Sequence, residues 1–225
     1  MTPEEIFYRR NLPHWHPKDR IFFITFRLAN SLPKAILQKL RNERQKKQTS
    51  IESLATKNEQ QRELYRLNKE YFGKYDTWLD RCLEGSPRWL GQESIARIVA
   101  DEIHKMDEER YRLLIYCFMP NHVHLLFDAT GFSQSSPTNL AGTTREYPLA
   151  DTLRLLKGRT ARWCNQALKR SGSFWHHESY DHVVRDEQEL GRIIQYILYN
   201  PVKAGLVEEW TEWPFTYLAP GWGEW

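Results

Sequence analysis

The sequence has few cysteines and no long apolar run. Its three cysteines, Cys82, Cys117 and Cys164, lie far apart in the 225 residues and form no Cys-x-x-Cys pair. This spacing argues against a disulfide scaffold and a cysteine zinc site, and it fits a reducing cytoplasm. The first ten residues, MTPEEIFYRR, lack the apolar segment of a signal peptide. No run approaches the roughly 18 apolar residues that a membrane span requires. We therefore expect a cytoplasmic protein with no membrane partner.

The chain also has little excess charge. Its 32 Lys and Arg stand against 29 Asp and Glu, which gives a formal net charge of +3. That mildly basic balance is too weak, alone, to require a nucleic-acid partner. Aromatic residues make up 13% of the chain, with nine tryptophans. Some of these rings should pack in a core, whereas others could stack on unpaired bases.

Two histidines separated by one apolar residue stand in the segment MPNHVHLLF, Met119–Phe127. The flanking residues are strand-like, and side chains alternate between the two faces of a strand. His122 and His124 should therefore point to one side while Val123 points into the core. Two imidazoles on one face form half of a divalent-cation site. A pair of ordinary core or surface histidines is the alternative interpretation.

A second pattern lies in IIQYILYNPVKAGLV, near the C-terminus. Asp186 has the position of a helix N-cap, and Pro201 indicates that this helix ends at Asn200. Tyr196 and Asn200 are four residues apart and hence neighbours on one helix face. A tyrosine beside an amide that can ligate a metal suits phosphoryl transfer, in which the phenolate attacks phosphorus. Alternatively, Tyr196 and Tyr199 are ordinary half-buried aromatics.

Taken together, these segments resemble the single-tyrosine HUH transposases, and most closely the branch of REP-associated tyrosine transposases. The resemblance covers nearly the whole chain and is weakest at 37–75 and 128–147. The matching blocks are RRNLPHW (Arg9–Trp15), ITFRLANSLP (Ile24–Pro33), WLDRCLEG (Trp78–Gly85), ERYRLLIYCFMPNHVHLL (Glu109–Leu126), Phe174–Asp186 and YILYNPVKAGLV.

The resemblance implies an enzyme that cuts and rejoins single-stranded DNA beside a palindromic hairpin. Tyr196 would be the nucleophile and would form a 5′-phosphotyrosine. His122, His124 and Asn200 would hold one Mg²⁺ or Mn²⁺. One departure is that related transposases often carry Gln at the position of Asn200, and Asn is one methylene shorter. No residue stands out as a general base for the tyrosine.

The order of expected elements is β-α-β-β-α-β, which fits an α+β, ferredoxin-like antiparallel sheet with helices on one face. We expect extended strands at 20–28, 111–118, 122–127 and 174–183, and helices at 91–106 and 149–170. The chain is interpreted as one domain, 1–225, with a helical insertion at 34–86 and a flexible loop at 129–148. A break between two helices of the insertion is expected at Gln48–Ser50.

Five basic residues are candidate DNA contacts. Arg154, Lys157 and Arg162 lie on the polar side of the helix expected at 149–170, and such a face suits phosphate contacts. Arg9 and Arg10 lie among aromatic residues near the N-terminus and could read the hairpin or a short guide sequence. A merely solvated helix face and exposed terminal charges are the alternatives.

Two other functions stay open at this stage. The first is a metal-dependent hydrolytic nuclease in which water is the nucleophile and Tyr196 is structural. The second is a catalytically silent module that binds DNA hairpins. The sequence does not distinguish a monomer from a homodimer, or a tyrosine acting in cis from one acting in trans.

Overall fold

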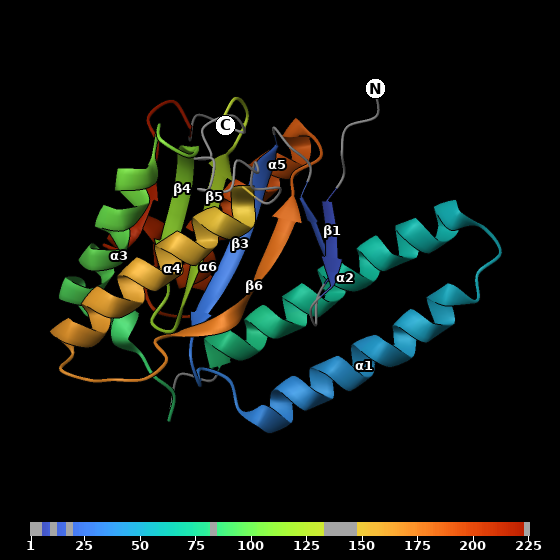
Figure 1. The fold of residues 1–225 in the computed structure, drawn as a ribbon, viewed down its shortest axis with the longest axis horizontal. Coiled ribbons are helices and arrows are strands. Elements are labelled where there is room, and N and C mark those ends of the chain that lie inside the picture. Colours follow the sequence, from blue (N-terminus) through green and yellow to red (C-terminus); the bar gives the residue numbers. More distant parts are fainter. Residues whose placement is uncertain (1–5, 10–12, 17–19, 82–84, 133–147, 223–225) are drawn as a thin grey trace, which may run out of the picture. The chain divides into compact units, whose positions relative to one another are not determined.

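The computed structural model describes residues 6–9, 13–16, 20–81, 85–132 and 148–222. The chain divides into two compact units (Figure 1). We call the unit of residues 1–29 and 88–225 the body, and the unit of residues 30–87 the helical hairpin. Most of the loop expected at 129–148 lies outside the described residues. Within the described ranges, every helix is too short or too polar to cross a membrane.

The body contains a five-stranded sheet in which all neighbouring strands are antiparallel, in the order β6-β3-β5-β4-β7. The chain order β3-α3-β4-β5-α4-β6 gives the expected β-α-β-β-α-β pattern, so the predicted α+β sheet is confirmed. The edge strand β7 was not predicted. The bounds are β3 Ile21–Leu28, α3 Glu93–Met106, β4 Arg112–Phe118, β5 His122–Asp128, α4 Pro148–Ala167, β6 Trp175–Val183 and β7 Thr216–Leu218.

Shorter elements complete the body. A two-stranded antiparallel sheet near the N-terminus pairs β1 with β2. After β6 the chain forms α5 and a one-turn helix, α6. The bounds are β1 Ile6–Arg9, β2 Pro13–His16, α5 Glu187–Leu198 and α6 Asn200–Lys203, with 3-10 turns at Trp89–Gly91 and Trp210–Glu212.

One face of the sheet forms the main core against α3 and α4. From β5, Val123, Leu125 and Phe127 point to this face and are fully or almost fully buried. Val99 of α3 and Leu156 of α4 are completely buried in the same cluster. Burying an apolar side chain of this size contributes about 1.5–3 kcal/mol, so this layer is the main source of the body's stability. These two helices are the predicted cover on one face.

The opposite face of the sheet carries the histidines. His122 and His124 alternate with the core residues of β5, and both are completely buried. Tyr196 of α5 contacts Phe23 of β3 and His124 on this face. The cover by α5 is an addition to the predicted fold. It follows from β3 and β5, whose side chains are buried on both faces, so that each face needs a covering element.

A tight turn between β4 and β5 fixes where the histidines begin. The Met119 N–H donates to the His122 carbonyl at 2.9 Å, which confirms the turn predicted at Pro120–Asn121. The Leu28 N–H, at the end of β3, donates to the Asn121 carbonyl at 2.9 Å. The turn is thereby tied to the neighbouring strand, and the register of His122 is set.

The helical hairpin consists of α1, Lys34–Glu52, and α2, Lys57–Arg81. The break between them is at 53–56, so the prediction of a break at Gln48–Ser50 was wrong by a turn. Thr49 and Ser50 lie inside α1, where their hydroxyls donate to the carbonyls of Gln45 and Lys46, four residues earlier. Thr56 then caps α2, since its Oγ1 accepts from the Glu59 N–H at 3.2 Å.

Candidate metal and nucleophile site

The two histidines of β5 face each other directly. The Nε2 atoms of His122 and His124 are 3.1 Å apart. Their rings are nearly perpendicular, with centroids 4.7 Å apart and an interplanar angle of 82°. Both side chains are 0% exposed. The structure therefore confirms that the two imidazoles share one face, and it brings their ring nitrogens together in a solvent-excluded position.

A second set of contacts orients the imidazoles from behind. The Nδ1–H of His122 donates to Oδ1 of Asn121 at 2.7 Å. His124 Nδ1 and the Thr25 hydroxyl share a hydrogen bond of 2.8 Å. Because the amide oxygen of Asn121 only accepts, its contact with His122 places the proton on Nδ1 and leaves the Nε2 lone pair of His122 directed toward His124. Such outer contacts are typical of metal-ligating histidines.

The donor set fits a divalent cation. Two nitrogens that each lie about 2.1 Å from one ion, at a right angle, are about 3.0 Å apart. The observed Nε2–Nε2 separation of 3.1 Å matches that spacing. Two buried imidazole nitrogens at this distance also need a proton or a cation between them, since two facing lone pairs repel. The pair is thus a candidate half-site for a metal.

Tyr196 lies beside this pair. Its ring centroid is 5.5 Å from that of His124, with an interplanar angle of 71°. Phe23 packs against both rings, at 5.8 Å from His124 and 6.1 Å from Tyr196. The tyrosine is half-buried. Phe23 therefore holds the phenol next to the imidazoles and leaves it accessible, which is the arrangement that a nucleophile beside a metal needs.

Tyr199 occupies a different position. It follows the last residue of α5 and its side chain is 51% exposed. It is not among the aromatic partners of the histidines in the described part of the chain. The two tyrosines of this segment are therefore distinguished by geometry, and Tyr196 alone meets the sheet.

Asn200 is completely buried and is the first residue of α6. We expected the helix to end at Asn200, but the chain instead starts a second helical turn there. The reason is that Pro201 has no N–H and suits the first turn of a helix. The Ala204 N–H donates to the Asn200 carbonyl at 2.9 Å and closes this turn. The role of Asn200 as a metal ligand stays a prediction.

Lys203 is a residue that the sequence analysis missed. Its Nζ lies 5.5 Å from the centroid of the Tyr196 ring. The ammonium is exposed and stands at the end of α6. A signal was present, because residues seven apart return to one face after two helical turns. Lys203 provides a positive charge beside the tyrosine.

The start of α5 is fixed to β6. Oδ1 of Asp186 accepts from the Glu189 N–H at 2.7 Å, which confirms the predicted N-cap. The Glu189 carboxylate accepts from the Arg185 N–H at 3.1 Å and lies 3.3 Å from Nε2 of His182 on β6. Glu189 is 3% exposed. These contacts determine where α5, and therefore Tyr196, sits on the sheet.

The candidate DNA-binding residues are in varied environments. The Lys157 ammonium donates to the carbonyls of His176 and His177 at 2.6 and 3.0 Å, so it ties α4 to β6. Arg154 is exposed and lies 3.3 Å from Asp151, and Arg162 lies over the ring of its neighbour Trp163. Arg9 ends β1, and Arg10 lies outside the described residues. Their contacts with DNA stay predictions.

His176 does not supply positive charge near neutral pH. Burial, reinforced by the nearby Arg27 cation, lowers the pKa of His176 to about 4. The imidazole is therefore neutral at pH 7. It is one of the half-buried side chains along β6 rather than a phosphate-binding cation.

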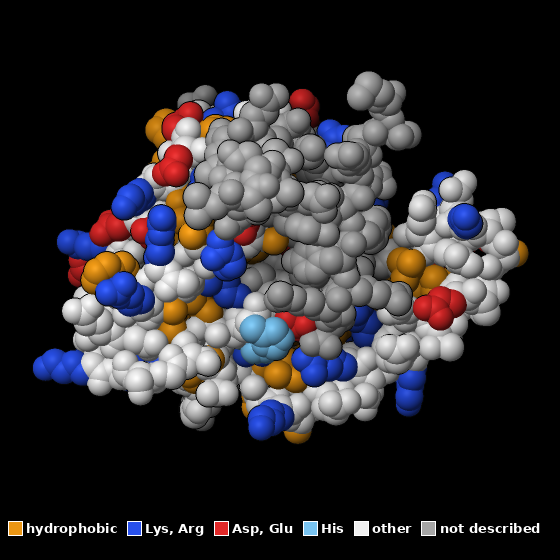
Figure 2. Space-filling view, in the orientation of Figure 1, with side chains coloured by type: hydrophobic (Ala, Val, Ile, Leu, Met, Phe, Trp, Pro, Cys, Tyr) orange, Lys and Arg blue, Asp and Glu red, His pale blue; other side chains and the backbone are white. Residues whose placement is uncertain are grey.

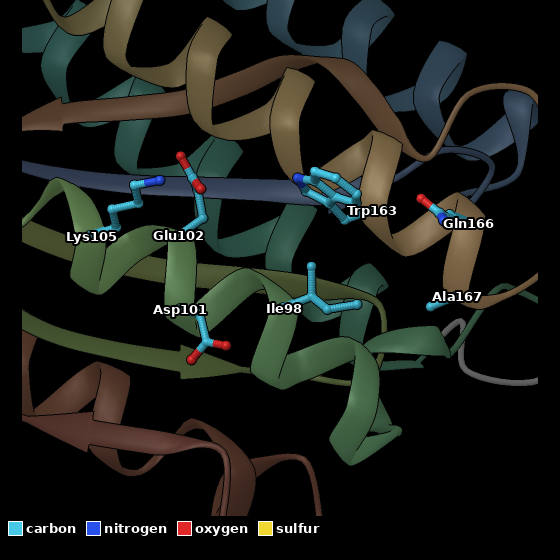
Figure 3. A pocket seen from close by; sticks show the side chains of 7 residues that line it. All are labelled: Ile98, Asp101, Glu102, Lys105, Trp163, Gln166 and Ala167. Atoms are coloured by element: carbon cyan, nitrogen blue, oxygen red, sulfur yellow. The ribbon is translucent and has the colours of Figure 1, made fainter.

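A shallow groove of about 460 Å³ runs between α3 and α4 (Figure 3). Trp163 is 50% exposed and lines this groove, while Cys164 beside it is buried in the core. The groove also holds Asp101 and Glu102. Since α3 and α4 cover the face opposite the histidines, we do not assign this groove to the site.

Comparisons with known proteins bear on this arrangement. No protein-family model matches the chain. A protein of Haemophilus influenzae named as a REP-associated tyrosine transposase is 27% identical over 106 residues. The match covers 47% of this chain and 58% of that relative's length. The resemblance to REP-associated tyrosine transposases is confirmed.

Solved structures show the fold. The structure of a REP-associated tyrosine transposase bound to a REP hairpin aligns with a TM-score of 0.51 at 15% identity. The alignment covers 93% of this chain and 80% of that one. A structure from Deinococcus radiodurans that is named as a transposase aligns with a TM-score of 0.37 at 14% identity. The alignment covers 81% of this chain and 91% of that one.

Proposed function

We propose that this protein cuts and rejoins single-stranded DNA beside a hairpin through a covalent tyrosine intermediate. The observation that carries the proposal is one cluster on the face of the sheet opposite α3 and α4. In it the Nε2 atoms of His122 and His124 are 3.1 Å apart, and the Tyr196 ring is 5.5 Å from His124. Few other functions need a paired-imidazole half-site and an accessible phenol at the same point.

The DNA partner is proposed from the relatives. One similar structure holds a REP hairpin, and the Haemophilus influenzae relative is named as a transposase of that class. The weak net charge of +3 supports a single strand that carries a hairpin better than a long duplex, because affinity for a long duplex depends on many phosphate contacts. A monomer and a homodimer both agree with this proposal.

His122, His124 and Asn200 would hold one Mg²⁺ or Mn²⁺. Imidazole ligands suit Mn²⁺, while the abundance of Mg²⁺ favours that ion in cells. When bound, the metal would polarise a non-bridging oxygen of the scissile phosphate. The contacts of Asn121 and Thr25 with the two imidazoles would keep both Nε2 atoms directed at the same place.

The reaction uses the Tyr196 hydroxyl as the nucleophile. A bond forms between its oxygen and the phosphorus, and the bond from phosphorus to the 3′ oxygen breaks. The 3′ oxygen takes up a proton and leaves as a hydroxyl, while the phenolic proton passes to water at the half-exposed ring. Attack by a 3′ hydroxyl on the 5′-phosphotyrosine reverses these bond changes and rejoins a strand. No ATP is needed, because the phosphodiester energy is retained.

Two side chains support this step without taking part in bond formation. The Lys203 ammonium, 5.5 Å from the Tyr196 ring centroid, would bind a phosphate oxygen and stabilise the charge that develops there. Phe23 would keep the phenol against His124, since it packs on both rings. A displacement of the phenol by about 1 Å can cost roughly 10²-fold in rate.

The test compares two forms of one labelled DNA. A single strand with a palindromic hairpin and the same sequence as a perfect duplex are incubated with the full chain and Mg²⁺ or Mn²⁺. We expect cleavage of the hairpin strand, little cleavage of the duplex, and none of either by Tyr196→Phe. Normal cleavage by Tyr196→Phe would instead assign a hydrolytic nuclease. Tight binding with no cleavage under any condition would assign a silent hairpin-binding module.

A further inference from the structure

The two units of the chain carry opposite net charge. Residues 30–87 contain twelve Lys and Arg and eight Asp and Glu, a formal charge of +4. The rest of the chain contains twenty Lys and Arg and twenty-one acidic residues, a formal charge of −1. The basic character of the whole protein, +3, therefore resides in the helical hairpin.

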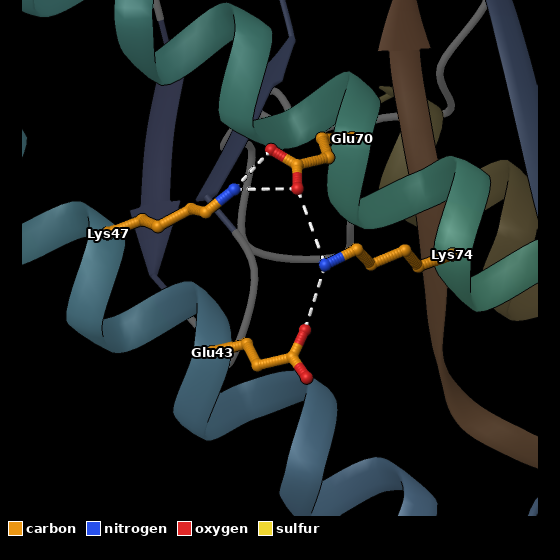
Figure 4. Close-up of polar contacts among 4 residues, drawn as sticks. All are labelled: Glu43, Lys47, Glu70 and Lys74. Atoms are coloured by element: carbon orange, nitrogen blue, oxygen red, sulfur yellow. Dashed lines mark hydrogen bonds and ion pairs between the residues drawn. The ribbon is translucent and has the colours of Figure 1, made fainter.

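Within the helical hairpin, the acidic residues between the helices hold α1 against α2 (Figure 4). The Lys47 ammonium donates to both oxygens of Glu70 at 2.6 Å. Lys74 of α2 donates to Glu43 of α1 at 2.9 Å and lies 3.3 Å from Glu70. These hydrogen bonds lower the pKa of both carboxyls. The carboxylates are thus directed inward, toward the other helix.

The side of α1 that faces away from α2 has a row of exposed side chains with no acidic residue among them. Seven exposed residues recur at helical spacing and form one continuous face, which we call the outer row. None of them is acidic or aromatic, and all but the alanine carry hydrogen-bond donors. The outer row is Ala35, Gln38, Lys39, Asn42, Gln45, Lys46 and Thr49. In Figure 2, scattered Lys and Arg side chains are visible at the lower right, where Figure 1 draws α1.

The outer row has the composition of a phosphate-binding surface. Most protein–DNA hydrogen bonds go to the sugar-phosphate backbone, from Lys and Arg and from Asn, Gln and Thr side chains. The row is straight and extends about 21 Å at 1.5 Å per residue. A duplex presents regularly spaced phosphates along such a line. A single strand would also need rings on which bases stack, and the outer row has none.

We propose that the outer row of α1 binds the sugar-phosphate backbone of duplex DNA, in particular the stem of the hairpin substrate. The proposal rests on the proposed function for the identity of the DNA. The helical hairpin contributes affinity that grows with stem length and carries no sequence information, while the reacting phosphate is handled by the body.

The test is a binding titration of the full chain with hairpin DNAs of short and long stem. The variant is Lys39→Glu combined with Lys46→Glu. The matched control exchanges Lys47→Glu with Glu70→Lys, which alters the same helix but keeps the net charge and the pairing between the helices. Lys39→Gln with Lys46→Gln gives a milder form, and a thermal melt verifies that each variant folds.

We expect the wild type to bind the long stem more tightly than the short one. The Glu variant should lose roughly 10- to 100-fold in affinity for the long stem at low salt, and the Gln variant less. The slope of log affinity against log salt should fall by about two in the Gln variant, one for each lost phosphate contact. The exchange control should bind as the wild type does.

Equal affinity of the wild type and the Glu variant for the long stem, with the same salt slope, would overturn the proposal. If the Glu variant lost as much affinity for an unstructured single strand of the same length, the outer row would bind single strands, and the proposal that it binds the duplex stem would be overturned. If no DNA is cleaved but the stem effect is present, the proposed function fails and the binding surface stands.

Discussion

The body and the helical hairpin place their candidate functional side chains in opposite environments. In the body, His122 and His124 are completely buried; His122 Nδ1–H donates to Asn121 Oδ1, and His124 Nδ1 shares a hydrogen bond with the Thr25 hydroxyl. In the helical hairpin, Lys39 and Lys46 are exposed on the outward side of one helix. The body has a formal charge of −1 and the helical hairpin one of +4.

This difference follows from what each task requires. Metal-assisted attack on phosphorus needs donors that stay fixed to within a fraction of an ångström, and only a packed environment fixes side chains so closely. Attraction to a phosphate backbone acts over a Debye length of about 8–10 Å in physiological salt and tolerates flexible lysines. Changes at the histidines and Tyr196 should therefore affect the rate, and changes on the outer row should affect affinity.

The largest expected effect is the loss of the imidazole pair. His124→Ala should lower the cleavage rate to below about 1% of the wild type, because it removes a metal donor and leaves His122 without its partner. EDTA should do the same to the wild type. Removal of an outer contact, as in Thr25→Val, should cost about 10- to 100-fold in metal affinity or activity.

Binding of hairpin DNA separates the two regions in this experiment. Affinity measured in EDTA should be nearly the same for His124→Ala and the wild type, since phosphate contacts elsewhere carry most of it. Undiminished cleavage in EDTA would contradict the metal role of the body.

A smaller effect is expected at Lys203. Lys203→Met removes the charge beside Tyr196 and should reduce the single-turnover rate at saturating DNA by about 10²-fold. Lys203→Arg keeps the charge and should recover most of the rate. If both variants cut at the wild-type rate and only the dissociation constant rises, Lys203 is a DNA-binding residue. The residues that set the cleavage rate are then limited to the histidines and Tyr196.

The N-cap of α5 tests whether the body positions the tyrosine through ordinary helix chemistry. Asp186→Ala should lower the free energy of unfolding by about 1 kcal/mol, because the Glu189 N–H loses its acceptor. Asp186→Asn retains an acceptor and should lie within a few tenths of the wild type. Urea unfolding measures both. An unchanged urea midpoint for the alanine variant would show that the position of α5 on the sheet does not depend on this cap.

The smallest effect belongs to the ion pairs of the helical hairpin. Lys47→Met removes the partner of Glu70, whose pKa is lowered mainly by that hydrogen bond. A lowered carboxyl pKa contributes stability above the ordinary value of 4.5 and loses it as the pH falls below that value. We expect a fall in melting temperature of at most about 2 °C at pH 7, which becomes smaller as the pH falls below 4.5. An undiminished difference at pH 3 would point to packing instead.

Local patterns in the sequence were sufficient for the sheet and for part of the site. Strand alternation placed His122 and His124 on one face, and the turn at Pro120–Asn121 and the Asp186 cap were found from residue type alone. These features depend on neighbouring residues, so a single sequence contains them.

Contacts between distant segments could not be found in this way. Thr25 meets His124 across 99 residues of sequence, and no local pattern pairs them. The edge strand β7 has three residues, which is too short to show alternation. The helix break was misplaced because Thr49 and Ser50, residues of weak helix propensity, nevertheless lie inside α1, which continues to Glu52.

The central claim is that Tyr196, and not water or Tyr199, attacks the DNA. The direct measurement is to incubate the full chain with a 5′-labelled or 3′-labelled hairpin strand and Mn²⁺, denature the mixture, and map any covalent protein–DNA product by mass spectrometry of its peptides. We expect a phosphotyrosine linkage at Tyr196 to the 5′ end of the downstream fragment, retained in Tyr199→Phe and absent in Tyr196→Phe. A linkage at Tyr199, or efficient cleavage with no covalent product at any time, would contradict it.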